Sequence, residues 1–228
     1  MSEFDLIGRL QQAVCLPAGD AVSGCSLGIG DDAALLEVPP GHELVVCTDT
    51  LVEGVHFPNG TSPGAIGHKA LAVNLSDLAA MGAQPTFFFM ALTLPREDSA
   101  WLDSFARGMA RLARQWRVQL AGGDTTSGPL SITITAMGTV EKGRALLRSG
   151  ARPRDLVVVS GAPGAAAHAL QRIRADKDTG APQRSALDYP EPRVGLGLSL
   201  GGLATACLDL SDGLAAELGH ILDLSGAG

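Results

Sequence analysis

Strand-like and helix-like segments alternate along residues 44–140 of this 228-residue chain. Short apolar runs and alternating apolar and polar residues indicate strands, and apolar residues at a spacing of three or four indicate helices. The segments are, in chain order, 44–48 (strand), 62–81 (helix), 85–94 (strand), 98–116 (helix), 118–121 (strand) and 130–140 (strand). Because strands that alternate with long helices form sheets covered by helices, the pattern predicts a mixed α/β (α+β) fold.

The two ends of the chain are read in the same way. Residues 3–15 carry apolar residues at helical spacing, which predicts an amphipathic helix, and 156–160 are expected to form a further strand. The polar, proline-interrupted segment 174–193 is expected to be a loop or insertion. A change of composition before residue 156 indicates two domains, 1–145 and 146–228.

Charge and composition exclude several classes of partner. The formal net charge is −7, and the chain has only three lysines, Lys69, Lys142 and Lys177, which argues against nucleic acid or anionic lipid as a partner. No apolar run is long enough to cross a membrane and the start does not resemble a signal peptide, so we expect a cytoplasmic protein. The four cysteines lack the spacing of a zinc site and are expected to be free thiols.

Seven aspartates lie beside Gly, Ser or Thr at predicted element ends. They are Asp31, Asp32, Asp49, Asp77, Asp124, Asp209 and Asp212. Any one of them could be a helix cap or an Asx-turn. Asp77 fits that explanation least well, because it falls inside an apolar helical segment, three residues after Asn74.

A set of acids on separate loops suits a magnesium–nucleotide site. Mg²⁺ prefers carboxylate and water oxygens and is commonly shared with substrate phosphates. The adjacent pair Asp31-Asp32, between glycines and apolar residues, would also be tolerated if divalent cations offset the repulsion.

Two other nucleotide-binding motifs fit poorly. Residues 28–33 match Gly-x-Gly-x-x-Ala, and Asp49 follows about 20 residues later, as a dinucleotide-binding fingerprint requires. However, the preceding residues are a poor strand, and Pro39-Pro40 leaves little room for a crossover helix. None of the lysines lies in a phosphate-binding P-loop motif.

Five motifs resemble those of the thiamine-monophosphate kinase family, in order and spacing. They are 30–34 (Gly-Asp-Asp-Ala-Ala), 48–57 (Thr-Asp-Thr-Leu-Val-Glu-Gly-Val-His-Phe), 69–83 (with Asn-Leu-Ser-Asp at 74–77), 122–126 (Gly-Gly-Asp-Thr-Thr) and 209–214 (Asp-Leu-Ser-Asp-Gly-Leu). The resemblance spans nearly the whole chain. The family that it indicates belongs to the aminoimidazole ribonucleotide synthetase superfamily.

The resemblance implies a fold and a reaction. It implies an N-terminal mixed-sheet domain for ATP and magnesium, which dimerises through its sheet into a homodimer, and a C-terminal α/β domain. Because the chain ends at Gly228, we expect this second domain to be incomplete here. The implied reaction is direct in-line transfer of the γ-phosphoryl group of ATP to thiamine monophosphate, assisted by several magnesium ions.

The resemblance also assigns roles to individual residues. Magnesium would be bound by Asp32, Thr48, Asp49, Asp77, Asp124, Asp209 and Asp212, with Asp31 and Cys47 as further candidates. ATP would contact Gly123, Asp124, Arg148 and Ser211, and thiamine monophosphate would contact His56. From the residues alone, the preferred interpretation of His56 is a histidine of a strand-end loop. Arg148 could be a surface arginine, although its charge beside a glycine turn also suits phosphate recognition. Cys47 stands where the family pattern suggests a hydroxyl residue, which leaves a backbone carbonyl as the ligand there.

The acceptor explains why the site is acidic and lacks a general base. A phosphate monoester has a second pKa near 6 and is mostly ionised at neutral pH, so its oxygen is already a nucleophile. The obstacle is the repulsion between two polyanions. Two alternatives stay open: another ATP-dependent enzyme of the same superfamily with a different acceptor, and a catalytically silent nucleotide-binding dimer.

Overall fold

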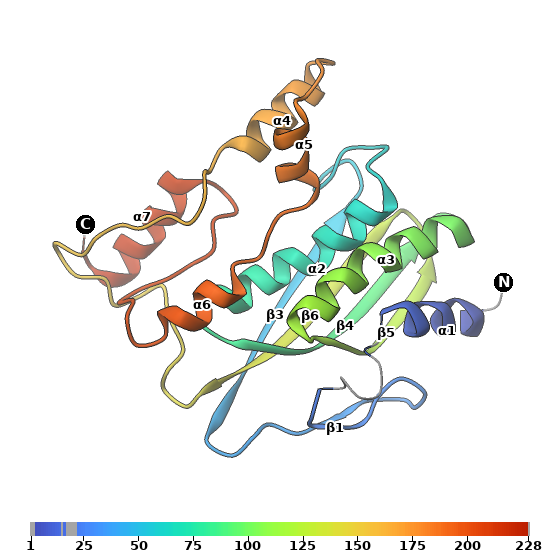
Figure 1. Cartoon of the computed structure of the whole chain (residues 1–228), viewed down its shortest axis with the longest axis horizontal. Helices are drawn as coiled ribbons and strands as arrows, with labels where there is room; N and C mark the ends of the chain where they lie inside the picture. The colour runs from blue at the N-terminus through green and yellow to red at the C-terminus, as the bar shows by residue number, and fades with distance from the viewer. Residues whose placement is uncertain (1–2, 15, 17–21, 228) are drawn as a thin grey trace.

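The computed structural model describes residues 3–14, 16 and 22–227 (Figure 1). Its centre is a four-stranded mixed sheet in the order β3-β6-β4-β5. β3 (His42–Val52) and β4 (Gln84–Leu94) both run antiparallel to β6 (Ser131–Glu141), which lies between them, and β5 (Gln119–Ser127) pairs in parallel with β4. The predicted mixed α/β fold is therefore confirmed.

Two long helices cover one face of the sheet. α2 (Pro63–Ala80) begins after Ser62, whose hydroxyl accepts a hydrogen bond from the Ala65 N–H at 3.4 Å. α3 (Ser99–Trp116) begins after Asp98, which caps the Trp101 N–H at 3.0 Å. These polar residues satisfy N–H groups that have no partner inside a helix, which fixes where each helix starts.

Glycines allow the helices to pack backbone to backbone. A Cβ atom on Gly67 would lie 2.1 Å from the Phe105 carbonyl oxygen, and one on Gly108 would lie 1.9 Å from that of Gly64. The same arrangement joins α6 (Val194–Leu200) to the end of α2, where a Cβ on Gly197 would lie 2.1 Å from the Ala79 oxygen. Larger residues at these positions would push the helices apart.

The remaining elements are short strands and helices. They are α1 (Glu3–Val14), which packs on α3, the antiparallel pair β1 (Cys25–Leu27) and β2 (Leu35–Leu36), α4 (Ala165–Arg174), α5 (Ala181–Asp188) and α7 (Leu214–Ser225). α4 and α5 lie side by side, and the two chain ends lie on opposite sides of the molecule (Figure 1). None of the described helices is long and apolar enough to span a bilayer.

One sequence prediction for the later part of the chain is wrong, and another holds only in part. No strand forms at 156–160, where Leu156 and Val158 are 90% and 85% exposed. Nothing in the described part of the chain pairs with this segment, and an unpaired strand gains neither ladder hydrogen bonds nor a buried face. Segment 174–193 is not simply a loop, because it contains α5.

The sheet also extends further than its apolar residues suggest. Asp49 and Asp124, which we expected at strand ends, lie inside β3 and β5. Pairing along the whole length of neighbouring strands carries these polar segments into the sheet. Residues 28–33 lead into the two-residue strand β2 rather than a helix, so the dinucleotide-binding alternative fails. The division into domains 1–145 and 146–228 stays a prediction.

Candidate active site

Three of the predicted aspartates come together from three separate elements. Asp49 lies on β3, Asp77 on the last turn of α2, and Asp209 in the segment before α7. Burial and then the charges of Asp209 and Asp49 raise the pKa of Asp77 to about 7, and hydrogen bonding with both carboxyls acts in the same direction. Carboxyl groups influence each other in this way only at close range. The structure therefore joins residues that are 160 positions apart in the chain (209 − 49).

Successive side chains of β3 point to opposite faces of the sheet, and this determines which of them face the carboxylate cluster. Thr48 and Thr50 are exposed on the open face of the sheet, where their hydroxyls hydrogen-bond those of Thr135 and Thr133 at 2.9 and 2.8 Å. Asp49 lies on the opposite face, which α2 covers. The Thr48 hydroxyl is thus not brought to the three carboxylates.

Two uncharged residues, Cys47 and Asn74, lie beside the carboxylates and hydrogen-bond each other. The Cys47 thiol donates to the Asn74 carbonyl oxygen at 3.4 Å, and the fully buried Asn74 amide donates to the Ala70 oxygen at 3.0 Å. Burial, followed by the charges of Asp77 and Asp49, raises the pKa of the Cys47 thiol to about 12. The thiol is therefore protonated at neutral pH in this structure, and a thiolate ligand at Cys47 would need a cation to displace the proton.

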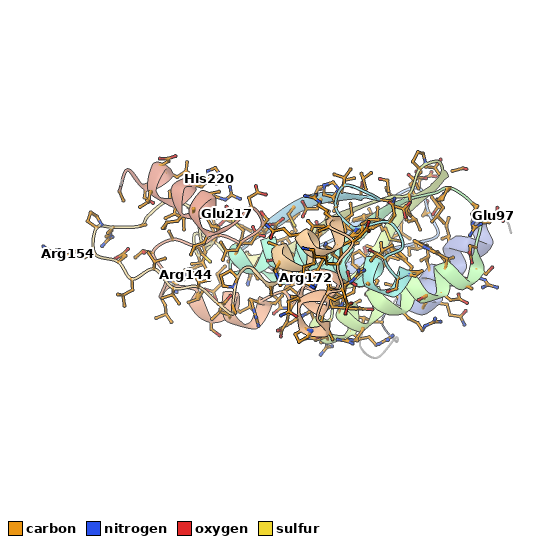
Figure 2. The ribbon with its side chains drawn as sticks, turned by 90° about the horizontal axis from the view of Figure 1, so that it is seen from above. Glu97, Arg144, Arg154, Arg172, Glu217 and His220 are labelled. Carbon is orange, nitrogen blue, oxygen red and sulfur yellow. The ribbon has the colours of Figure 1, made fainter. Side chains whose placement is uncertain are left out.

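The loop that carries Asp209 is held by a buried carboxylate from α7. Glu217 is 4% exposed, and its Oε1 accepts hydrogen bonds from the Ser211 hydroxyl and the Asp212 N–H, both at 3.2 Å. Burial raises the pKa of Asp209, with Glu217 and Asp49 adding to the shift, while hydrogen bonding to Asp77 and the charge of Arg148 oppose it. Figure 2 shows Glu217 on α7.

Gly123 lies in the same row of the sheet as Asp49, and Asp124 lies in the next row, that of Thr50, so neither is beside Asp49. The register runs from Asp49 to Ile134 on β6, then to Met90 on β4 and Gly123 on β5. Three strand spacings give a separation of roughly 14 Å along this row. Position 123 also requires glycine, because a Cβ there would lie 2.0 Å from the Met90 carbonyl oxygen.

The remaining predicted ligands are exposed. Asp31 and Asp32 lie in an exposed bend, where the Asp32 N–H donates to Asp31 Oδ1 at 2.8 Å, so one carboxylate is engaged by the backbone of its neighbour. Arg148 and Asp212 are also exposed, although Arg148 is close enough to Asp209 to affect its pKa.

His56 lies in a tight turn directly after β3. The Val52 N–H donates to His56 Nδ1 at 3.0 Å, and the Val52 carbonyl oxygen accepts from the His56 N–H at 2.9 Å. Because neutral imidazole carries one proton, acceptance at Nδ1 leaves Nε2 as the donor. Phe57, 2% exposed, anchors the turn in the core.

The carboxylate cluster has the chemistry of a site for a hard divalent cation. Oxygen-only ligands suit Mg²⁺, and a cation would relieve the repulsion that raises the pKa of Asp77. Within the described residues, however, no group of three or more His, Cys, Asp or Glu side chains is placed so that it could hold a metal ion by itself. The oxygen-only chemistry of Asp49, Asp77 and Asp209 suits magnesium, for which further oxygens would have to come from water or from phosphate.

Sequence reasoning missed two residues of this site. Glu217 could have been noticed as an acid one turn into the helix that follows Asp212-Gly213, where free N–H groups attract a carboxylate. Lys69, whose ammonium group donates to the His56 carbonyl oxygen at 3.0 Å, carries no such signal, because that contact depends on how α2 packs.

Comparison with known proteins agrees with this fold. Residues 30–140 match the family model described as AIR synthase related protein, N-terminal domain. This part of the chain is therefore an AIR synthase-related N-terminal domain.

Individual relatives identify the family more specifically. A thiamine-monophosphate kinase from Escherichia coli is 47% identical over 233 residues, which cover 99% of this chain and 70% of that protein. The crystal structure of thiamine-monophosphate kinase from Stenotrophomonas maltophilia is 45% identical with a TM-score of 0.88, over 99% of this chain and 73% of that one. AaThiL complexed with AMPPCP and TMP is 30% identical with a TM-score of 0.77, over 98% of this chain and 70% of that one. The chain belongs to the thiamine-monophosphate kinase family.

Proposed function

We propose that this chain transfers the γ-phosphoryl group of ATP to thiamine monophosphate, in the biosynthesis of thiamine diphosphate. An oxygen of the acceptor phosphate forms a bond to the γ-phosphorus while the bond from that phosphorus to the β,γ-bridging oxygen breaks. The products are thiamine diphosphate and ADP. The observation that carries the proposal is the convergence of Asp49, Asp77 and Asp209, supported by family membership and by the AaThiL complex with AMPPCP and TMP.

The acidic residues would hold magnesium. Asp49, Asp77 and Asp209 would form its centre, and the outer ligands proposed are Asp32, Asp124, Asp212 and the Thr48 backbone, with Asp31 and the Cys47 backbone as further candidates. Magnesium, when bound, would neutralise phosphate charge and orient donor and acceptor oxygens for in-line transfer.

Other residues of the chain would orient the two substrates. Arg148, beside Asp209, would contact ATP phosphate oxygens with its guanidinium N–H groups. Ser211, fixed by Glu217, and the Gly123-Asp124 backbone would also contact ATP. His56 would donate from Nε2 to thiamine monophosphate, since its Nδ1 is occupied.

The open face of the sheet is the proposed homodimer surface. Leu44 and Val46 on β3 are 46% and 50% exposed, beside the exposed Thr48 and Thr50. Within the residues that the structure describes, no second layer covers this half-apolar face, and such a face is typical of a surface that packs on another layer. A monomeric mass from solution scattering at micromolar concentration would contradict this assembly.

Chromatographic detection of thiamine diphosphate tests the activity. The purified chain, alongside the full product of its gene, would be supplied with ATP, Mg²⁺ and thiamine monophosphate. We expect thiamine diphosphate and ADP in equal amounts, and no product when EDTA is added. Magnesium-dependent ATP binding without product would instead support a different acceptor, and neither binding nor product would support a silent module.

A further inference from the structure

The His56 turn is fixed from several directions. Besides the two contacts with Val52, the Gly54 N–H donates to the Phe57 carbonyl oxygen at 2.9 Å, and Phe57 is buried. These contacts all come from the turn itself and from Val52 at the end of β3. The His56 carbonyl oxygen points outward from this local network and is met by Lys69, at 3.0 Å, from α2.

Lys69 is a partly buried cation with a specific electrostatic environment. Burial lowers its pKa, the carboxylate of Asp188 opposes that shift, and the guanidinium of Arg184 adds to it. Lys69 therefore lies between the turn that carries His56 and the end of α5. Burying a cation is costly unless it is paired or hydrogen-bonded, and here the His56 carbonyl and Asp188 supply the compensation.

The end of α5 is itself docked onto α2. Arg184 Nε lies 2.5 Å from Asp188 Oδ2, and Asp188 is 8% exposed. The neighbouring residue of α2, His68, bonds the Pro190 carbonyl oxygen through Nε2 at 2.8 Å and packs edge-on against the Tyr189 ring at 5.2 Å. The segment 184–190 is thus anchored to α2 next to Lys69, where the charge of Asp188 reaches the ammonium group.

We propose that Lys69 is a positioning residue: its ammonium group, through its hydrogen bond to the His56 carbonyl oxygen, fixes the His56 turn in the form that receives the acceptor substrate. This inference rests on the proposed function, in which His56 contacts thiamine monophosphate. The role is distinct from metal binding, because Lys69 acts on a backbone carbonyl next to the substrate-facing imidazole. It also gives α5, in the segment first expected to be a loop, a function in acceptor affinity.

Steady-state kinetics of Lys69→Met and Lys69→Arg in the full gene product test this role, with Lys142→Met as the matched control. Lys142 is an exposed lysine beyond β6. For Lys69→Met we expect the KM for thiamine monophosphate to rise about tenfold, the size of effect when a hydrogen bond from a charged group is lost. The KM for ATP and kcat should change less than about twofold. Lys69→Arg, which keeps a cationic donor, should recover most of the affinity, and Lys142→Met should match the unmodified chain.

An unchanged KM for thiamine monophosphate, or an equal loss of affinity for both substrates, would overturn the proposal. If Lys69→Met fails to fold, Lys69→Gln keeps a shorter donor without charge and should show the same selective loss. Hydrogen exchange of the peptide 52–58 gives a second readout that needs no turnover. In Lys69→Met, exchange should be faster in 52–58 and unchanged in 84–94. Equal exchange of 52–58 in the variant and the unmodified chain would overturn the proposal about Lys69. A lack of kinase activity in the unmodified chain would instead refute the proposed function and leave this readout valid.

Discussion

Residues 25–141 and residues 146–227 are built in different ways, although each contributes to the same acidic site. The first region contains every described strand, whereas the second contains only short helices and connections. The described hydrophobic core draws on the first region and α1, with Val194 as its one member from the second. Large apolar residues such as Leu156 and Leu203 are exposed in the second region, at 90% and 78%. Asp49 and Asp77 therefore lie on a well-packed frame, while Asp209 depends on local polar contacts.

The largest effect is expected at the shared carboxylates. Asp49→Asn keeps the size of the side chain but removes its charge, so turnover should fall by about a thousandfold or more, in the range seen when a group that stabilises transition-state charge is lost. Assays of thiamine diphosphate formation, with circular dichroism as a check of the fold, measure this. Turnover close to that of the unmodified chain, in a folded variant, would remove Asp49 from the site.

Truncating a large apolar residue should cost more stability in the first region than in the second. Phe88 on β4 is fully buried, so Phe88→Ala should lower the free energy of unfolding by about 3–5 kcal/mol. Leu203→Ala, in the second region, should change it by less than about 0.5 kcal/mol, because Leu203 is 78% exposed. Urea denaturation followed by fluorescence compares them, and similar losses in both variants would show that the second region has a core of its own.

Substitution of Glu217 tests whether its hydrogen bonds position the loop that carries Asp209 in the second region. Glu217→Ala removes the acceptor for Ser211 and Asp212 and should raise the KM for ATP by about tenfold, the effect of losing hydrogen bonds from a buried acceptor. Glu217→Gln keeps an amide oxygen and should show a smaller rise. The idea fails if Glu217→Ala binds ATP, measured by calorimetry with Mg²⁺, as tightly as the unmodified chain.

The smallest expected effect is a pH dependence of stability in the absence of metal. Because the pKa of Asp77 is raised in the fold from 3.8 to about 7, the native state binds more protons than the unfolded chain between those values. Stability should therefore fall as the pH rises from about 4 to about 7, and the partial exposure of Asp77 moderates the slope. Thermal melts in EDTA should show this slope, and Asp77→Asn should reduce it. A slope of opposite sign, or one that persists unchanged in the variant, would contradict the assignment.

Helix positions were readily predictable, and the reason lies in local chemistry. Ser62-Pro63 and Asp98 mark helix starts through contacts within three residues, so α2 and α3 follow from the sequence almost to the residue. The apolar residues of 156–160 predicted a strand, but none forms there. A strand needs a partner strand, and the local pattern of residues does not say whether one is available. In the same way, β5 extends through Asp124 because β4 pairs with it.

The acidic composition, the spacing of the aspartate motifs and the periodicity of the long helices are properties of the sequence alone. They were sufficient for the fold class and for the choice of Asp49, Asp77 and Asp209 as candidates. Tertiary structure decided the rest: that these three meet while Asp31 and Asp32 lie in a separate exposed turn, that the Thr48 hydroxyl lies on the other face of the sheet, and that Glu217 and Lys69 support the site. The physical reason is that charge interactions and hydrogen bonds depend on distance in space, which packing of sheet and helices sets, whereas caps and apolar periods depend on neighbours along the chain.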